Sequence, residues 1–116
     1  MSKLIYKISS GDAWRRAVEV GEFTGAPIDM QDGYIHFSTA GQVVETASKH
    51  FTGLDDLILV AVEAERLGAA LKWEPSRGGA LFPHLYASLP LDAVYSVEPL
   101  PLGPDGQHVF PAGIKT

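Results

Sequence analysis

One uninterrupted apolar stretch, residues 57–62, constrains the fold of this chain more than any other feature of its sequence. The stretch reads Leu-Ile-Leu-Val-Ala-Val and lacks the alternation of apolar and polar side chains expected of a strand with one face in water. Such a strand is typical of the middle of a sheet that is covered on both faces. It is also far shorter than the ~20 apolar residues that a membrane-spanning helix needs. We therefore expect a central strand here, in a protein that does not cross a membrane.

The residues before this stretch predict a strand, a helix and a loop. Residues 4–8 alternate as a strand does, and apolar residues with helical spacing follow them. Ser10 or Asp12 can cap the free amides of that helix, and Gly21 can end it. Residues 25–32 are rich in Gly, Pro and Asp, so we expect them to form a loop.

A second strand and a second helix are predicted directly after that loop. Residues 33–38 alternate like a strand. Thr39 and Gln42 have the spacing of a capping box, which predicts a helix over residues 40–51. The polar face of the strand is expected to carry three side chains: Tyr34, His36 and Ser38.

Three more strands are predicted after the central one. A charged turn over residues 63–68 leads to two strands that flank a glycine turn at residues 75–79. Pro83 cannot donate a hydrogen bond to a sheet, so we expect its strand to be bulged or to lie on an edge. Residues 93–97 supply the last strand, and residues 101–116 form a tail outside the regular pattern.

Together these elements predict a single α+β domain over residues 1–116, with a core at residues 3–100 and the tail at 101–116. We expect a split sheet, mixed or antiparallel, of about six strands with two main helices. A hydrophobic fraction of 46% and a charged fraction of 20% are ordinary for a soluble globular protein. The chain has no cysteine, which excludes disulfide bonds and cysteine-bound metals. Packing alone must therefore hold the fold together.

Charge and the N-terminal residues narrow the choice of partners and location. A net charge of −5 and a pI near 5.2 disfavour nucleic acid as a partner, because nucleic-acid-binding domains usually carry a basic face. The N-terminal residues place lysine within their apolar stretch and have no signal-peptide core. We therefore expect a soluble, cytoplasmic protein.

His36 and the hydroxyl groups that follow it form the first candidate site. A strand histidine, with Ser38 and Thr39 at the start of a helix, can together meet an anion or a ribose hydroxyl. The alternative is structural: the backbone satisfies His36, while Ser38 and Thr39 only cap the helix. The sequence leaves both interpretations open.

The hairpin at residues 72–86 forms the second candidate site. One face of its second strand carries three side chains: Phe82, His84 and Tyr86. His84 and Tyr86 can line a pocket for a planar ring, and Glu74 can orient a hydroxyl or stabilise a developing cation. The structural alternatives are rings that belong to the core and a surface ion pair between Glu74 and Arg77.

Two imidazoles and a carboxylate can also hold a divalent metal ion. His36, Glu74 and His84 are the candidate ligands. They come from separate strands and lack close spacing such as His-x-x-x-His, so we assign no metal site.

Several blocks of residues carry a family resemblance, and their order and spacing make it specific. The blocks are residues 32–39, Gln42 with residues 46–47 and 50–51, residues 71–74, and residues 81–86. In these blocks the chain resembles a small, mainly bacterial family of unknown function, domain of unknown function 952. The resemblance runs from about residue 3 to residue 100 and leaves out the tail. That family is similar in fold to the ADP-ribosyltransferases, whose split, mixed sheets bind NAD in a central cleft.

The resemblance also implies roles for individual residues. In one branch of those transferases a strand histidine holds the ribose of NAD, a tyrosine stacks on nicotinamide, and a glutamate assists the reaction. His36 resembles that histidine, Tyr86 or Tyr34 the tyrosine, and Glu74 the glutamate that stabilises a ribosyl cation. The catalytic residues implied in this way are Glu74 and His36. The implied nucleotide-binding residues are Tyr34, His36, Ser38, Thr39, His84 and Tyr86.

Three classes of function remain open at this point. The first is an enzyme that takes NAD or a related nucleotide as its substrate, needs no further cofactor, and transfers or hydrolyses the ADP-ribosyl group. The second is a binding module that recognises a nucleotide or another small ligand without turnover. The third is a metal-assisted hydrolase.

Overall fold

The predicted central strand lies in the middle of the largest sheet. The structure is a computed structural model that describes residues 3–76, 79–111 and 114. Strand β5 (Leu57–Glu63) lies between β1 (Leu4–Ser10) and β9 (Val94–Leu100) in a four-stranded antiparallel sheet of order β4-β1-β5-β9, in which β4 is Ser38–Thr39. This prediction is confirmed, and the strands predicted at residues 4–8 and 93–97 are present and longer than expected.

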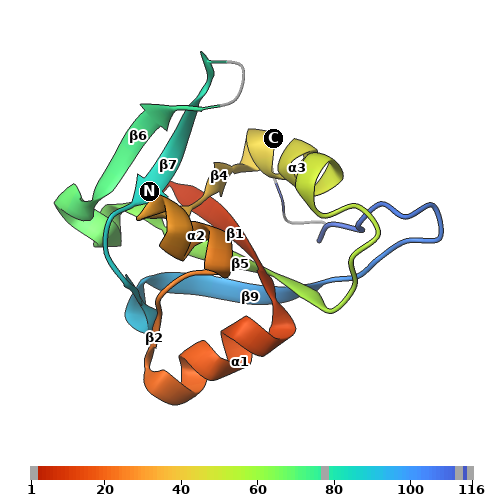
Figure 1. Ribbon diagram of the computed structural model, residues 1–116, viewed down its shortest axis with the longest axis horizontal. Coiled ribbons are helices and arrows are strands. Elements are labelled where there is room, and N and C mark those ends of the chain that lie inside the picture. Colours follow the sequence, from red (N-terminus) through yellow and green to blue (C-terminus); the bar gives the residue numbers. More distant parts are fainter. Residues whose placement is uncertain (1–2, 77–78, 112–113, 115–116) are drawn as a thin grey trace.

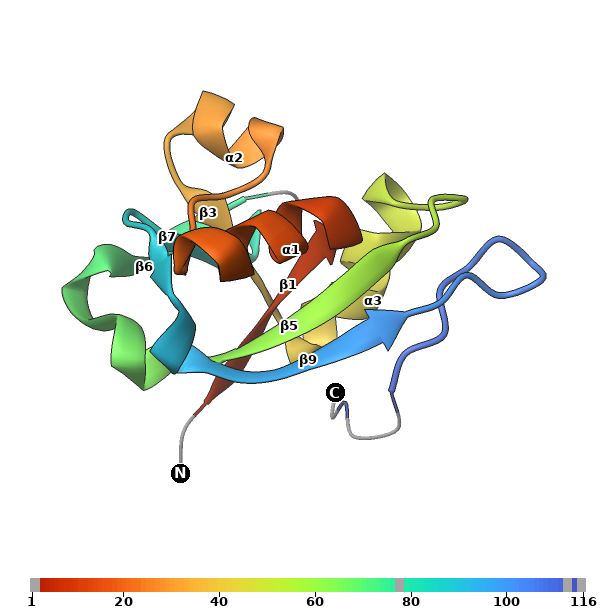
Figure 2. The ribbon, with the colours of Figure 1, turned by 90° about the horizontal axis from the view of Figure 1, so that it is seen from below.

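Both faces of this sheet are covered, which explains why β5 shows no alternation. Helix α1 (Gly11–Val20) and helix α3 (Ala40–His50) lie on opposite sides of the sheet (Figure 1 and Figure 2). Val60 and Val62 belong to the core that includes α1, while Leu59 and Ala61 belong to the core that includes α3. Successive side chains of β5 therefore enter different apolar cores.

The two main helices begin and end at residues predicted from the sequence. The Ser10 hydroxyl oxygen accepts a hydrogen bond of 3.1 Å from the Ala13 amide at the start of α1. Gly21 ends α1 with a φ of 100°, a left-handed conformation in which glycine carries no steric penalty. At the start of α3, the Thr39 amide donates a hydrogen bond of 3.0 Å to the Gln42 side chain, as expected of a capping box.

Residues 33–38 do not form the continuous strand that their alternation predicts. The segment divides at Phe37 into β3 (Ile35–His36), which pairs with β7 (Leu81–Leu85), and β4 (Ser38–Thr39), which pairs with β1. Strands β3, β7 and β6 (Leu71–Pro75) form a separate three-stranded antiparallel sheet in the order β3-β7-β6. The prediction of one strand was wrong because alternation does not reveal that a strand changes partner partway along.

Pro83 lies in the middle strand of this second sheet, so the expectation of an edge or bulged strand was also wrong. In an antiparallel ladder, the N–H and C=O of one residue face the same neighbouring strand. The carbonyl of Pro83 accepts a hydrogen bond of 3.0 Å from the Phe37 amide. The side of Pro83 that lacks an N–H therefore faces the end of β3. The hydrogen bonds between β7 and β6 are not interrupted.

Residues 25–32 contain a short helix rather than only a loop. Helix α2 (Pro27–Asp32) begins with a proline, whose fixed φ suits the first helical position, and ends at Gly33. The Asp29 carboxylate accepts a hydrogen bond of 2.8 Å from the Ala26 amide and so caps its own helix. The prediction of a loop missed this helix because Asp29, which caps it, belongs to a segment whose composition is typical of a loop.

The remaining elements are short, and together they make the chain a single α+β domain. They are β2 (Glu22–Phe23), β8 (Leu89–Pro90), and the 3-10 helices η1 (Ala64–Ala70) and η3 (Leu91–Ala93). The predicted number of about six strands falls short of the nine in the described part of the chain, since β2, β3, β4 and β8 have two residues each. All the strand pairs in the described part of the chain are antiparallel.

The tail is anchored to the same core that α3 covers. Leu102 and His108 form a bridge, and Phe110 and Ile114 pack against the apolar core below α3. Among the described residues, no helix is long and apolar enough to span a membrane.

Candidate functional site

A cavity opens where the chain leaves the first sheet to join the second. Strand β4 pairs with β1 only at Ile5 and Tyr6, and the preceding residue, Phe37, already bonds to β7. Strand β4 therefore does not pair with the next residues of β1, Lys7 and Ile8. A cavity of about 480 Å³ lies there.

The cavity brings together the two candidate sites predicted from distant parts of the sequence. His36 and Ser38 line it from one side, and Phe82 and His84 line it from β7. The other lining residues come mainly from β1 and α3: Tyr6, Lys7, Ile8, Ile28, Phe37, Thr46, His50, Phe51 and Ser76. Four predicted site residues do not line it: Tyr34, Thr39, Glu74 and Tyr86.

A buried ion pair supports one wall of the cavity. Lys7 Nζ lies 2.8 Å from Asp29 Oδ2 and 3.0 Å from Oδ1, and both side chains are buried. Burial lowers the pKa of Lys7, and the adjacent carboxylate opposes that effect. Burial alone raises the pKa of Asp29, but hydrogen bonds from His36, Lys7 and the Ala26 amide, with the charge of Lys7, hold that pKa at about 2.

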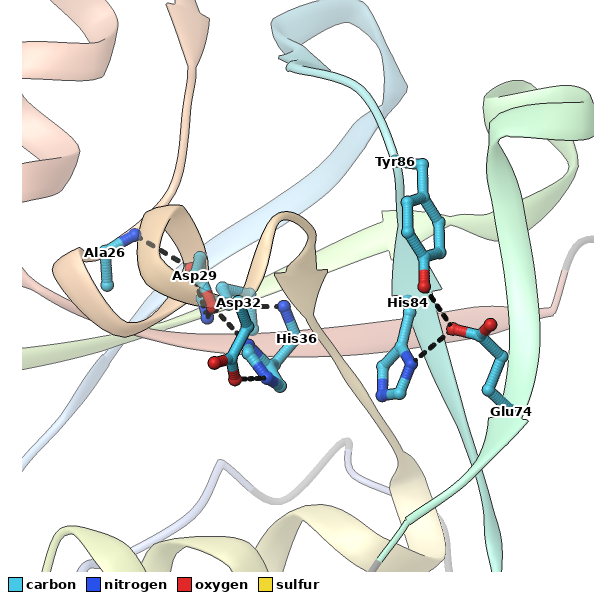
Figure 3. Close-up of polar contacts among 8 residues, drawn as sticks. Ala26, Asp29, Asp32, His36, Glu74, His84 and Tyr86 are labelled. Carbon is cyan, nitrogen blue, oxygen red and sulfur yellow. Dashed lines mark hydrogen bonds and ion pairs between the residues drawn. The ribbon is translucent and has the colours of Figure 1, made fainter.

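His36 is held by two carboxylates. Its Nδ1 lies 2.6 Å from Asp29 Oδ1, and its Nε2 lies 3.0 Å from Asp32 Oδ2 (Figure 3). Only a doubly protonated ring can donate to both carboxylates at once. The backbone amide of His36 also donates to Asp29 at 3.1 Å. A ligand that bonds to this ring must therefore displace Asp32, the half-exposed partner.

Glu74 joins His84 and Tyr86 into a second cluster. Glu74 Oε1 lies 2.8 Å from His84 Nδ1 and accepts a hydrogen bond of 2.7 Å from the Tyr86 hydroxyl (Figure 3). These two bonds lower the pKa of Glu74. The same carboxylate raises the pKa of Tyr86 to about 12, because it stabilises the neutral phenol.

The ring of Tyr34 connects the two clusters. It stacks on His84 with the ring centres 4.2 Å apart, and it lies 4.6 Å from His36 and 5.1 Å from Tyr86. His36 and His84 are opposite each other in the β3–β7 ladder, with ring centres 5.6 Å apart. The structure thus brings the predicted histidines, tyrosines and glutamate into one region.

The hydroxyl groups divide between a cap and the cavity. Thr39 caps α3 through its backbone, which agrees with the structural alternative for this residue. Ser38 is buried, lines the cavity, and has its hydroxyl 3.0 Å from that of Thr46. Thr46 itself donates to the Gln42 carbonyl at 3.1 Å, so the Ser38 hydroxyl must donate to Thr46. The oxygen of Ser38 is left as an acceptor beside the cavity.

The residues of the metal-site hypothesis lie close together, but both nitrogens of His36 face Asp29 and Asp32, and Glu74 is bonded to Nδ1 of His84. Within residues 3–76, 79–111 and 114, no group of three or more histidine, aspartate or glutamate side chains is arranged to hold a metal ion. Arg77 and Gly78, predicted to be structural, lie outside the described residues.

Lys7 and Asp29 are the site residues that sequence reasoning missed. A lysine inside an alternating apolar strand is a usable signal, because a buried strand lysine requires a partner carboxylate. Asp29 gave no signal of its own, since aspartate is common in segments with the composition of a loop.

We expect acid to remove roughly 2 kcal/mol of stability between about pH 4 and pH 2 through Asp29. The pKa of this group is about 2 in the folded protein, against an ordinary value of 3.8. Because the folded value is depressed, the stabilisation is complete above the ordinary value and is lost as the pH falls through the folded one. Urea titrations at successive pH values measure this loss.

Two variants separate the contribution of Asp29 from general acid effects. Asp29→Asn has no carboxyl group at this position and is expected to lose the acid step, whereas Asp55→Asn, at an exposed position before β5, is expected to keep it. An Asp29→Asn variant with an undiminished acid step would contradict the assignment.

The fold and this arrangement define a small α+β domain with a polar and aromatic cavity at a split between two sheets. The family described as "Protein of unknown function (DUF952)" matches residues 8–97, and the chain belongs to it. The resemblance to that family is thereby confirmed.

Solved structures of one bacterial protein are similar to this chain. The crystal structure of protein CC0527 from Caulobacter crescentus has 50% sequence identity, a TM-score of 0.88, and an alignment covering 91% of this chain and 93% of that one. Its solution NMR structure has 51% identity, a TM-score of 0.81, and coverage of 90% of each chain. None of the curated proteins compared with the chain matches it.

Proposed function

We propose that this domain binds NAD or a related nucleotide in the cavity and cleaves the bond between its ribose and nicotinamide, by ADP-ribosyl transfer or hydrolysis. One observation carries the proposal: the cavity is lined both by hydroxyl groups, including that of Ser38, and by aromatic rings, including those of Phe51 and Phe82. Its volume of about 480 Å³ is in the ordinary range for a small-molecule site. The ADP-ribosyltransferase-like fold is part of this proposal, and the split between two antiparallel sheets supports it.

These two kinds of lining side chain suit the ribose and the base of a nucleoside. Ser38 presents an acceptor oxygen, which suits a ribose hydroxyl that donates. Phe51 and Phe82 supply apolar ring surface for a planar base. Lys7 adds a donor group, and none of the described residues that line the cavity is an aspartate or a glutamate.

The second candidate function is nucleotide binding without turnover. The position of Glu74 favours it, because this residue does not line the cavity and its Oε1 is already bonded to His84 and Tyr86. The predicted role of Glu74 in stabilising a ribosyl cation thus requires a ligand that reaches past His84.

Blocking the mouth of the cavity tests the proposed binding. Ile28 lines the cavity but is 54% exposed, so Ile28→Trp can fill the opening without disturbing the core. We expect this variant to bind NAD at least ~10-fold more weakly in calorimetry, which corresponds to about 1.4 kcal/mol. Ser38→Ala is expected to weaken binding about 3- to 10-fold, the usual contribution of one hydrogen bond.

A matched control comes from the same helix. Met30 is 69% exposed and does not line the cavity, so Met30→Trp is expected to bind NAD as the native protein does. Titrations with ADP-ribose and with nicotinamide show which half of the ligand is held. Absence of binding by the native protein at millimolar NAD would refute the proposal, and so would equal affinities of the two tryptophan variants.

A further inference from the structure

His84 differs from His36 in what its ring presents to the cavity. Both nitrogens of His36 face carboxylates. His84 bonds to Glu74 through Nδ1 only, and Figure 3 shows its other nitrogen on the side of the ring away from Glu74. Among the described residues, Nε2 of His84 has no hydrogen-bond partner. His84 is 3% exposed and lines the cavity.

The tautomer of His84 follows from the chemistry of its partner. Hydrogen bonds from His84 and Tyr86 lower the pKa of Glu74, so its carboxylate is ionised and can only accept. The bond of 2.8 Å therefore requires a proton on His84 Nδ1. In the neutral ring the lone pair is then on Nε2, the atom that faces away from the carboxylate.

The ring of His84 is also fixed in place by its neighbours. Tyr34 stacks on it at 4.2 Å, and the strand pairs place it between Lys72 of β6 and His36 of β3. Glu74 is itself held by Tyr86. A histidine whose second nitrogen is oriented by a carboxylate is a recurring arrangement for a general base.

We propose that His84 is the catalytic base of this site and accepts a proton from an O–H nucleophile, either water or an acceptor hydroxyl, while Glu74 is a positioning residue. This inference rests on the proposed function and changes the role of both residues. His36 does not offer the same arrangement, because both nitrogens of its ring already face carboxylates.

The proposed step balances in atoms and charge. The oxygen of the nucleophile forms a bond to C1′ of the ribose as its proton passes to Nε2 of His84. The bond between C1′ and the ring nitrogen of nicotinamide breaks, and its electron pair leaves with nicotinamide, which changes from a cationic ring to a neutral one. His84 then releases the proton to solvent. With water as the nucleophile, the products are ADP-ribose, nicotinamide and one proton.

Kinetics of nicotinamide release from NAD test the catalytic role. We expect His84→Gln to lower kcat by about 10²- to 10⁴-fold with little change in KM, because general-base catalysis contributes this much to rate rather than to binding. Glu74→Gln is expected to lower kcat by a smaller factor. His108→Gln is the matched control, since His108 lies on the tail, bonds to the Leu54 carbonyl and does not line the cavity. We expect its kcat to be unchanged.

Nitrogen-15 NMR of the imidazole rings tests the arrangement without turnover. The native protein is expected to show His84 with the proton on Nδ1, and Glu74→Gln is expected to shift the ring toward a mixture of tautomers. A native ring protonated on Nε2 alone overturns the proposal, whether or not NAD binds.

The remaining outcomes separate this proposal from the proposed function. NAD that binds with the cavity-dependent affinity described above, but releases no nicotinamide, overturns the catalytic base and leaves nucleotide binding in place. Absence of NAD binding overturns both. Equal kcat values for native protein and His84→Gln overturn the catalytic base alone.

Discussion

Replacing Asp29 with alanine is expected to lower the free energy of unfolding by roughly 3–5 kcal/mol, the usual cost of leaving one buried charge without its partner. The side chain of Asp29 is 1% exposed and that of its partner Lys7 is 7% exposed. Asp29 also accepts hydrogen bonds from the amides of Ala26 and His36, which would lose their partner. Urea denaturation at neutral pH measures the change, with the midpoint and slope fitted separately.

A double variant tests whether the unpaired charge causes the loss. Lys7→Met in the Asp29→Ala background removes the remaining ion, so we expect it to recover part of the stability. Asp32→Ala is the control, because Asp32 contacts the same histidine but is 38% exposed, and its loss should cost about 1 kcal/mol or less. An Asp29→Ala variant as stable as the control would contradict this account.

The sequence predicted the parts of the fold whose signal is local. Residues 57–62 needed only their own composition to be placed between two covered faces, and Ser10, Gly21 and Gln42 act within a few residues of their own helices. Each of these signals depends on backbone geometry that the nearby residues determine. No knowledge of distant pairing was required.

The sequence could not predict features that depend on which strands meet. Pro83 sits in a middle strand because the facing segment turns away at Phe37, and nothing near either residue reveals that change of partner. The ion pair between Lys7 and Asp29 spans 22 residues and forms only once α2 packs over β1. Composition predicted that Asp29 lies in a loop, whereas in the fold its side chain is buried in an ion pair with Lys7.

The candidate site likewise has features that the sequence predicts and features that depend on tertiary contacts. Chemistry marked His36, Ser38, Glu74 and His84 as functional candidates, and the β3–β7 ladder does place the two histidines opposite each other. The direction of each polar atom depends on its neighbours, however. Asp29 and Asp32 occupy the nitrogens of His36, while Glu74 occupies only one nitrogen of His84. Residue type alone could not distinguish a histidine with one nitrogen available to a ligand from a histidine whose two nitrogens both face carboxylates.

Phe23→Ala is expected to destabilise the fold by roughly 3–5 kcal/mol, because truncating a buried phenylalanine removes apolar contacts and leaves a cavity. Phe23 is 2% exposed, packs against Trp14 with ring centres 5.7 Å apart, and lies in the core on the α1 side of the sheet. Urea denaturation measures the loss. Val20→Ala, at a side chain that is 67% exposed, should change stability by about 0.5 kcal/mol or less.

The same variant separates the stability of the fold from the function of the cavity. Phe23 does not line the cavity, so the folded fraction of Phe23→Ala should bind NAD with native affinity even though that fraction is smaller. Ile28→Trp should behave in the opposite way, with native stability and weakened binding, because its side chain is exposed at the mouth. If Phe23→Ala instead weakens binding by the folded fraction as strongly as Ile28→Trp does, the core and the cavity are one energetic unit.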